Sequence, residues 1–573
     1  MTIAPVQLAA LVHSKVGAMR ELGQRAVHGA SARWARWAIA GWCLLTAVVA
    51  VTQAIAVSPT VAQNALPPST AASNTILAWG DNQFGQLGDG TGADSGTPIP
   101  VSLPPGTTVT AIAAGNEHSL ALTSTGTVLA WGRNRFGQLG DETNTSRVTP
   151  VTVSLPPNTT ITDIAAGHSH SLAITSAGTA LAWGGNGAGQ LGDGTTTDSN
   201  KPVAVNLPSG TTVTAIAAGE GHSLAVTSAG TALGWGSNSL GQLGDGTTND
   251  STTPVAVSLS PGTTVTDIAA SRSHSLAVTS AGTALAWGSN FHGQFGDGTN
   301  TSSNTPVTVS PPTGTAFTAV AAGEDHSLAV TSAGTALAAG DNLYGQLGDG
   351  TNTSSNTFVT VSLPPSTTIT AIAVGRFHNL GVTATGTALA WGINIDGQLG
   401  DGTTTNRNTP QAVDLPVSTT VAGGFGHSLA LAAPPTSTTT LQVTPPSPTA
   451  DQEVTLTAAV TCTSETPTGT ITFRTTTTAL ATEPLTTGAT ATHTTTLPAG
   501  THTLTAGYTS TNTCPDSQSI PTSITIHPPA DDPDLPITGP NLPTTIGTAS
   551  LLIVTGAVLI QLAHRRRPTH HPR

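Results

Sequence analysis

The chain repeats itself with a period of 52 residues through most of its length. Each repeat carries a close variant of the pattern Trp-Gly-x-Asn-x-x-Gly-Gln-Leu-Gly-Asp-Gly. A unit of this size cannot bury its apolar face alone, so the copies must pack against one another. Ala339 stands at the one point of the series that lacks a tryptophan, and the other six points are Trp79, Trp131, Trp183, Trp235, Trp287 and Trp391.

A second element, His-Ser-Leu-Ala or a variant of it, lies between consecutive tryptophan points. Between His222 and Trp235, small apolar residues alternate on both sides of a glycine-containing turn, which is typical of a β-hairpin. The histidine of this element recurs seven times, at His118, His170, His222, His274, His326, His378 and His427.

The order of these two half-repeats determines how the ends meet. The repeat region begins with a tryptophan-type half at Thr75 and ends with a histidine-type half at Ala433, so each end has a strand without its hairpin partner. Pairing these two strands closes a ring and removes an exposed sheet edge. We therefore expect an all-β fold in which residues 74–433 form a seven-bladed β-propeller. The 63 glycines and 40 prolines suit its short strands and tight turns.

The Gly-Gln-Leu-Gly motif and the blade length resemble the repeat family of the regulator of chromosome condensation, from about Asn74 to Ala433. The resemblance implies a propeller that acts as a protein-binding ring. Members of that family include guanine nucleotide exchange factors that act on a small nuclear GTPase and dock on chromatin. Secreted bacterial relatives include propellers that inhibit β-lactamases.

The repeated histidines and the seven aspartates of the Gly-Asp motif are interpreted as structural. A group that occurs once per blade is spread around the ring, and an aspartate before glycine suits the capping of a turn. His168 and His170 have metal-binding spacing, but no third ligand is nearby in the sequence. The chain has no Gly-x-Ser-x-Gly, His-Glu-x-x-His or phosphate-loop motif. We expect no enzymatic activity, no metal site and no cofactor.

Recognition is expected where the repeats differ from one another. Two windows vary: the x positions of the Trp-Gly-x-Asn-x-x-Gly loop, and the residues just before the repeated histidine. Both flank strand ends, so they should lie on loops at the propeller faces, where rigid scaffolds usually bind. Drift of solvent-exposed loops would give the same variation without binding. Aromatic and arginine side chains anchor interfaces, and the predicted partner-binding residues are Phe84, Arg135, Phe136, Leu240, Phe291, Tyr344, Phe377 and Phe425.

A Pro/Thr-rich linker is expected at residues 434–448, and a small Ig-like β-sandwich at residues 438–527. The stretch from Leu497 to Tyr508 resembles the late hairpin of bacterial Ig-like domains found in surface proteins. An oxidising location and an even count suggest a disulfide between Cys462 and Cys514. Two buried free thiols are the alternative.

Residues 1–56 have the order of a secretory signal. A basic flank precedes an apolar run from Ala38 to Val57, which contains the small-residue site Ala54-Ile55-Ala56. The run approaches the roughly 20 residues that cross a bilayer, so an uncleaved membrane anchor is the alternative. Residues 57–73 are expected to be a linker, and helices are expected only in the segments at the two ends.

Residues 528–573 resemble the cell-wall sorting signal of Gram-positive surface proteins. The motif Leu535-Pro536-Ile537-Thr538-Gly539 is followed by an apolar helix expected at 546–563 and a basic tail at 564–573. In that family a sortase cleaves before the glycine and transfers the threonine acyl group, here that of Thr538, to a peptidoglycan amine. The resemblance implies that sortase and peptidoglycan are partners. A permanent C-terminal membrane helix is the alternative.

The charge balance excludes one class of partner. The chain has 17 Lys+Arg against 30 Asp+Glu, and residues 74–433 have 7 against 21. Such a surface gains little from counterion release at phosphates, so nucleic acid is not expected as a partner. We interpret the chain as a wall-anchored extracellular protein whose propeller binds an unknown extracellular protein. The alternatives are inhibition of an extracellular hydrolase such as a β-lactamase, and nucleotide exchange, which an extracellular location disfavours.

Overall fold

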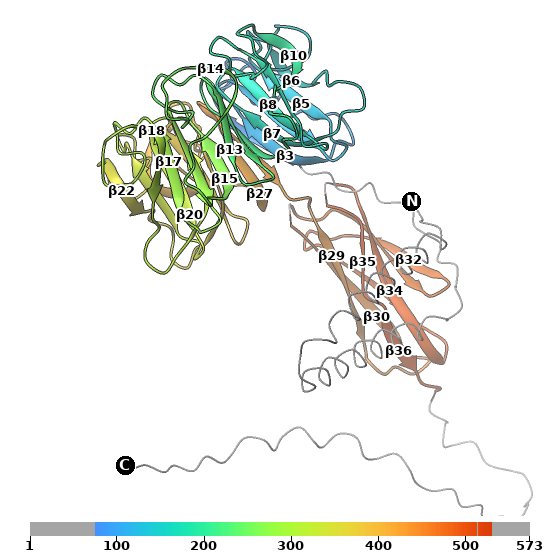
Figure 1. Cartoon of the computed structure of the whole chain (residues 1–573). Coiled ribbons are helices and arrows are strands. Elements are labelled where there is room, and N and C mark those ends of the chain that lie inside the picture. Colours follow the sequence, from blue (N-terminus) through green and yellow to red (C-terminus); the bar gives the residue numbers. More distant parts are fainter. Residues whose placement is uncertain (1–74, 464, 513, 530–573) are drawn as a thin grey trace, which may run out of the picture. The chain divides into compact units, whose positions relative to one another are not determined.

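The computed structural model describes residues 75–463, 465–512 and 514–529. The regular secondary structure of these residues consists of β-strands, which form a propeller and a β-sandwich (Figure 1). These described residues contain no helix that is long and apolar enough to cross a membrane. The expected secretory signal, the linker at 57–73 and the sorting motif lie outside the described residues.

The first two strands of each blade flank the variable residues that precede the repeated histidine. The innermost strands surround the central opening and are β3 (Val109–Ala114), β7 (Ile161–Ala166), β11 (Val213–Ala218), β15 (Val265–Ala270), β19 (Phe317–Ala322), β23 (Ile369–Val374) and β27 (Ser418–Gly423). The second strands begin at the histidine itself and are β4 (His118–Thr123), β8 (His170–Thr175), β12 (His222–Thr227), β16 (His274–Thr279), β20 (His326–Thr331), β24 (His378–Thr383) and β28 (His427–Ala432).

The other two strands of each blade come from the tryptophan element and from the Pro-containing segment that follows it. The third strands are β1 (Thr75–Gly80), β5 (Val128–Gly132), β9 (Ala180–Gly184), β13 (Ala232–Gly236), β17 (Ala284–Gly288), β21 (Ala336–Gly340) and β25 (Ala388–Gly392). The outer strands are β2 (Ser95–Pro100), β6 (Arg147–Thr152), β10 (Ser199–Ala204), β14 (Ser251–Ala256), β18 (Ser303–Val309), β22 (Ser355–Thr360) and β26 (Arg407–Ala412).

The described residues contain seven such antiparallel blades, and the last one closes the ring. Blades 1 to 6 are β3–β6, β7–β10, β11–β14, β15–β18, β19–β22 and β23–β26, and blade 7 combines β27 and β28 with β1 and β2. Strand β1 pairs with β28, with Thr75 opposite Ala432 and Gly80 opposite His427. The predicted seven-bladed propeller and its closure are therefore confirmed.

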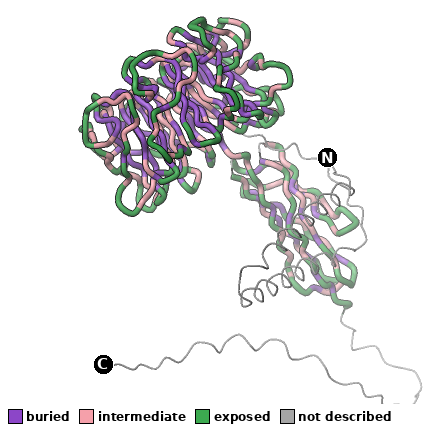
Figure 2. The backbone as a smooth tube through the Cα atoms, viewed as in Figure 1, coloured by how far each residue is buried: buried purple, intermediate pink, exposed green. Residues whose placement is uncertain are grey.

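The tryptophan side chains pack between neighbouring blades and hold them together. The buried residues lie along the strands of the blades (Figure 2). Trp131 of blade 1 is fully buried in a cluster with Ile76 and Leu429 of blade 7. Its indole N–H donates a 2.8 Å hydrogen bond to the carbonyl of Gln86. Gly88 lies against this indole at φ +70°, and a Cβ there would lie 2.7 Å from Nε1. This contact explains the second glycine of the Gly-Gln-Leu-Gly motif.

Blade 5 fills the space of the missing tryptophan with phenylalanine. Phe358 stands where the other six outer strands have proline, and its ring lies 5.5 Å from that of Phe317. Both pack with the buried Phe295, which replaces the leucine of the repeat motif. A Cβ on Gly296 would lie 2.6 Å from the Phe358 ring. At the equivalent glycines of the other blades, the neighbouring ring is that of a tryptophan. Blade 5 thus keeps an apolar interface although Ala339 lacks an indole.

The β-sandwich buries one face of each of its two sheets. Val454 and Leu456 of one sheet pack with Ile471, Phe473 and Tyr508 of the other. One sheet has the order β29–β30–β33, and the other has β32–β31–β34, with β35 and β36 both paired to β34. The strands are β29 (Ser437–Thr444), β30 (Val454–Cys462), β31 (Gly469–Thr475), β32 (Ala479–Pro484), β33 (Thr490–Thr495), β34 (Gly500–Ser510), β35 (Ser517–Gln518) and β36 (Thr522–Ile526).

Cys462 and Cys514 form a disulfide, with their Cα atoms 5.9 Å apart. The linker expected at 434–448 is shorter than the sequence suggested, because strand β29 occupies Ser437–Thr444. Threonine, valine and leucine in this stretch fit a half-buried strand better than an extended spacer.

Candidate functional site

Both variable windows lie on one face of the propeller. His118 at the start of β4 is opposite Gly132 at the end of β5, so the loops before β4 and after β5 are adjacent. The N–H of Arg133 donates to the carbonyl of Glu117 at 2.7 Å, which joins the two loops. We call this side the variable face. The opposite side, the constant face, carries the hairpins with the repeated sequence Thr-Ser-Ala-Gly-Thr or a close variant.

Exposed apolar side chains gather on the variable face. Phe291, Leu343 and Ile395 occupy the same loop position in blades 4, 5 and 6, and 66%, 65% and 63% of their surfaces are exposed. Leu240 and Phe425 are exposed on this face as well. The remaining large apolar side chains that are exposed in the described part of the propeller are Val148, on an outer strand, and Val417, beside the constant-face hairpin at Gly386.

Several predicted aromatic residues are less exposed than the sequence suggested. Phe84, Phe136, Tyr344 and Phe377 are only partly exposed, whereas Phe291 and Phe425 are exposed. The backbone N–H of Phe84 donates to the Gln86 side chain at 2.9 Å, and this bond holds the second x position against the loop. Arginines cover part of these rings: Arg133 lies 4.6 Å from the ring of Phe84, and Arg135 lies 5.5 Å from that of Phe136.

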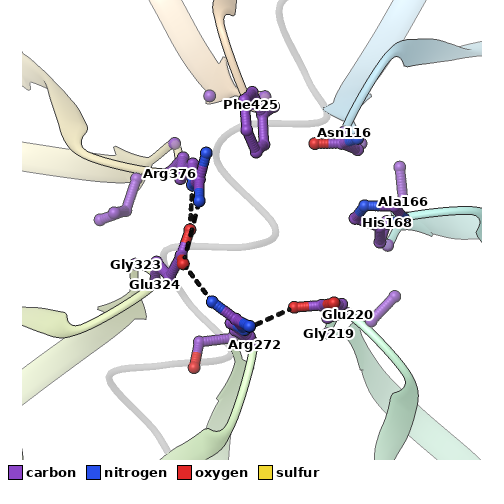
Figure 3. A pocket seen from close by; sticks show the side chains of 18 of the residues that line it. Asn116, Ala166, His168, Gly219, Glu220, Arg272, Gly323, Glu324, Arg376 and Phe425 are labelled. Carbon is purple, nitrogen blue, oxygen red and sulfur yellow. Dashed lines mark hydrogen bonds and ion pairs between the residues drawn. The ribbon is translucent and has the colours of Figure 1, made fainter. Parts of the chain in front are cut away.

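One residue from each blade surrounds a cavity of about 310 Å³ at the central opening (Figure 3). Each of these residues follows the glycine, or in blade 4 the serine, after an innermost strand. The volume lies at the lower end of the range for ligand pockets. In blade order the seven residues are Asn116, His168, Glu220, Arg272, Glu324, Arg376 and Phe425.

Four of these residues form an alternating arc of ion pairs. Nε of Arg272 lies 3.0 Å from Glu220, and its Nη1 lies 2.5 Å from Glu324, which also pairs with Arg376 (Figure 3). Burial raises the pKa of the Glu324 carboxyl, but the hydrogen bonds from Arg376 and Arg272 outweigh that effect and lower it. The arc is therefore charge-balanced and pre-organised.

An aromatic stack runs outward from this arc. The guanidinium of Arg376 lies 4.2 Å from the ring centre of Phe425 and 4.7 Å from that of Phe377, whose ring is 5.3 Å from that of Tyr344. We call these four residues the aromatic stack. The aromatic stack contains three of the predicted partner-binding residues, Tyr344, Phe377 and Phe425. The other five predicted residues lie elsewhere, on blades 7, 1, 3 and 4.

Leu343, Ile395 and Arg376 are not among the predicted site residues, although all three lie in the variable windows. The first x of Asn-x-x-Gly is exposed in every blade, so an apolar residue there is the sign that could have identified Leu343 and Ile395. Arg376 becomes notable only through its neighbours in space.

The repeated aspartates and histidines have structural roles. Asp89 accepts hydrogen bonds from Asn82 at 3.1 Å and from the Thr91 N–H at 3.0 Å, which stabilises the loop. His118 is fully buried, and its Nε2 lies 3.0 Å from Ser171 Oγ of the next blade. In the part of the chain that the structure describes, no three His, Cys, Asp or Glu side chains are grouped so that they could hold a metal.

Comparison with known proteins agrees with this architecture. The RCC1-like domain matches residues 74–430, and the bacterial Ig-like domain (group 3) matches residues 440–527. The chain belongs to the RCC1-like domain family. The ultraviolet-B receptor UVR8 of Arabidopsis thaliana is 32% identical over 340 residues, which are 59% of this chain and 77% of UVR8.

A second relative is matched over a small part of its own length. The human E3 ubiquitin-protein ligase HERC2 is 31% identical over 369 residues, or 63% of this chain, but this match spans 8% of HERC2. Among solved structures, human WBSCR16 has a TM-score of 0.58 at 24% identity, covering 63% of this chain and 99% of that one. Prp20p of Saccharomyces cerevisiae has a TM-score of 0.56 at 24% identity, covering 63% and 91%. These two structures support the fold alone.

Proposed function

We propose that the propeller is a non-enzymatic protein-binding module and that the variable face is its binding surface. The observation that carries this proposal is the gathering of exposed apolar side chains and of inter-repeat variation on one face. Exposed apolar side chains in the loops of a rigid scaffold are candidate anchors of a protein interface. The partner is an extracellular protein, which could be an adhesion target or a hydrolase that the ring inhibits.

The first test of this proposal is retention of partner proteins by the full chain, immobilised and exposed to secreted and surface proteins. A Leu343→Ser/Ile395→Ser/Phe425→Ser variant is expected to lose about tenfold or more in affinity, because it removes three exposed apolar anchors. The matched control is Val417→Ser, which removes an exposed apolar side chain beside the constant face. Retention that is absent, or equal for the triple variant and the wild type, would contradict the proposal.

We further propose that sortase links Thr538 to peptidoglycan, so that the propeller is displayed outside a Gram-positive cell. The support is the sequence order of motif, apolar segment and basic tail, all outside the described residues. A Thr538→Ala variant is expected to lose its covalent linkage to the wall fraction and to appear in the membrane or the medium. Release of the wild-type protein from the wall by detergent alone would argue against this anchor.

A further inference from the structure

We infer that blades 5, 6 and 7 of the variable face bind a basic segment of a partner protein whose tip is apolar. The inference rests on the proposed function and adds to it a location on the ring and a chemistry for the partner. The apolar part of this surface is the aromatic stack with the rim residues Leu343 and Ile395. Two pairs of aspartates form its charged part.

The first aspartate pair joins blades 6 and 7. A Cβ on Gly426 would lie 3.0 Å from Oδ2 of Asp396 and 3.2 Å from Cβ of Asp81, so both side chains meet over the residue that follows Phe425. Among the described residues, neither carboxylate has an ion-pair partner within 4.0 Å. Burial raises the pKa of the Asp396 carboxyl, and the charges of Asp81 and Asp94 raise it further.

The second pair lies on blade 5. The N–H of Asp341 donates to the carbonyl of Asp325 at 2.9 Å, so the two residues are adjacent. Burial raises the pKa of the Asp325 carboxyl; His292 of blade 4 opposes this shift, and Glu324 and Asp341 add to it. Blade 5 has no lysine or arginine, and the two arginines of blade 6 are paired elsewhere, Arg376 with Glu324 and Arg407 with Asp401. The charge of Arg272 of blade 4 lowers the pKa of the Asp325 carboxyl, but Arg272 is itself paired with Glu220 and Glu324.

These features together select the chemistry of the partner. A neutral or acidic partner would cover the four carboxylates without a counter-charge, which is costly once water is excluded. Lysine or arginine side chains on both sides of an apolar tip would neutralise the aspartates, while the tip contacts Phe425 and the rim. The excess of 21 acidic over 7 basic residues in the propeller would attract such a segment at long range.

The test uses the full chain as bait for a library of short disulfide-closed random peptides. Enriched peptides are expected to combine basic residues with an aromatic or aliphatic residue. Their affinity should fall about tenfold or more for Asp325→Asn/Asp396→Asn and with rising salt. The control Asp414→Asn/Glu453→Gln removes two exposed acidic residues elsewhere and should leave the affinity unchanged.

The outcomes separate this inference from the function on which it rests. Peptides that are lost with Leu343→Ser/Ile395→Ser/Phe425→Ser but are unaffected by the aspartate changes would overturn the inference and leave the binding face intact. Peptides that are unaffected by both sets of changes would overturn both proposals. Enrichment of acidic or neutral peptides, or of none, would also overturn the inference.

Discussion

The propeller is expected to unfold cooperatively when the pH falls from 7 to 5. All seven repeated histidines are fully buried, and burial lowers their pKa values to about 3 or about 4. In the unfolded chain the same side chains have pKa values near 6.5. Below that value the unfolded state therefore binds up to seven more protons, so the stability present above pH 6.5 is lost as the pH falls.

The hydrogen-bond pattern explains why these histidines resist protonation. Ser171 Oγ donates to the carbonyl of Gln138 at 2.9 Å, so it must accept the bond from His118, whose Nε2 carries the proton. Nδ1 of His118 is buried without a hydrogen-bond partner among the described residues, and the same is true of five other repeated histidines. His274 is different, because its Nδ1 lies 2.8 Å from Ser271 Oγ. A second proton would thus be buried without an acceptor at six positions.

The expected effect is large because seven groups act together. Each histidine contributes a loss of about 2 kcal/mol at pH 5, whereas a typical domain is stable by about 5–15 kcal/mol in total. Circular dichroism against pH, with the free energy of unfolding measured at each pH, checks this result. His168→Gln is the control, because it removes an exposed imidazole and keeps the interblade hydrogen bond that the backbone N–H of this residue donates to the Gly219 carbonyl at 3.1 Å. A free energy of unfolding that stays constant between pH 7 and pH 5 would contradict the account.

Deleting residues Thr75–Gly80 is expected to abolish cooperative unfolding of the propeller. This strand pairs with β28 at all six of its positions and closes blade 7. The deletion also removes the buried side chains of Ile76 and Trp79, and with them the 2.8 Å bond from Trp79 to the Gln398 carbonyl. Losing each of these side chains costs about 2–5 kcal/mol, and strand β28 is left as an unpaired edge. Thermal unfolding followed by circular dichroism, together with limited proteolysis, measures the loss.

A replacement variant provides the control for this deletion. Residues 127–132 have the sequence Thr-Val-Leu-Ala-Trp-Gly, which differs from residues 75–80 only by valine in place of Ile76. Inserting that sequence in place of the deleted strand should restore cooperative unfolding, with a cost of about 0.5–1.5 kcal/mol for the missing methylene. A deletion variant that unfolds at the wild-type temperature would show that the ring does not depend on this closure.

The sequence predicted the ring because closure depends on counting. The repeat region contains two types of half-repeat, and one half-repeat of each type is left without a partner, near Thr75 and near Ala433. These two end strands can pair with each other only if the ring closes. The role of Phe358 could not be predicted from the sequence in the same way. Its role in replacing the tryptophan missing at Ala339 depends on packing between blades, and no periodicity of the sequence expresses that contact.

The candidate site was only partly predictable. Variation between repeats located both windows, but the pattern does not say which way a side chain points within a loop. Tyr344 and Phe377 pack against each other and are only partly exposed, whereas Leu343 and Ile395 form the exposed rim. The arc of Glu220, Arg272 and Glu324 brings together residues that are 52 positions apart along the chain, and only the packing of neighbouring blades places them in contact.

Hydrogen exchange of the full chain, with and without a captured partner, tests the central claim most directly. The account predicts that the partner slows exchange in the variable-face loops, above all at residues 341–345, 376–377 and 425–426, and leaves the Thr-Ser-Ala-Gly-Thr hairpins unchanged. Protection confined to those hairpins, or to the β-sandwich, would contradict the assignment of the variable face as the binding surface.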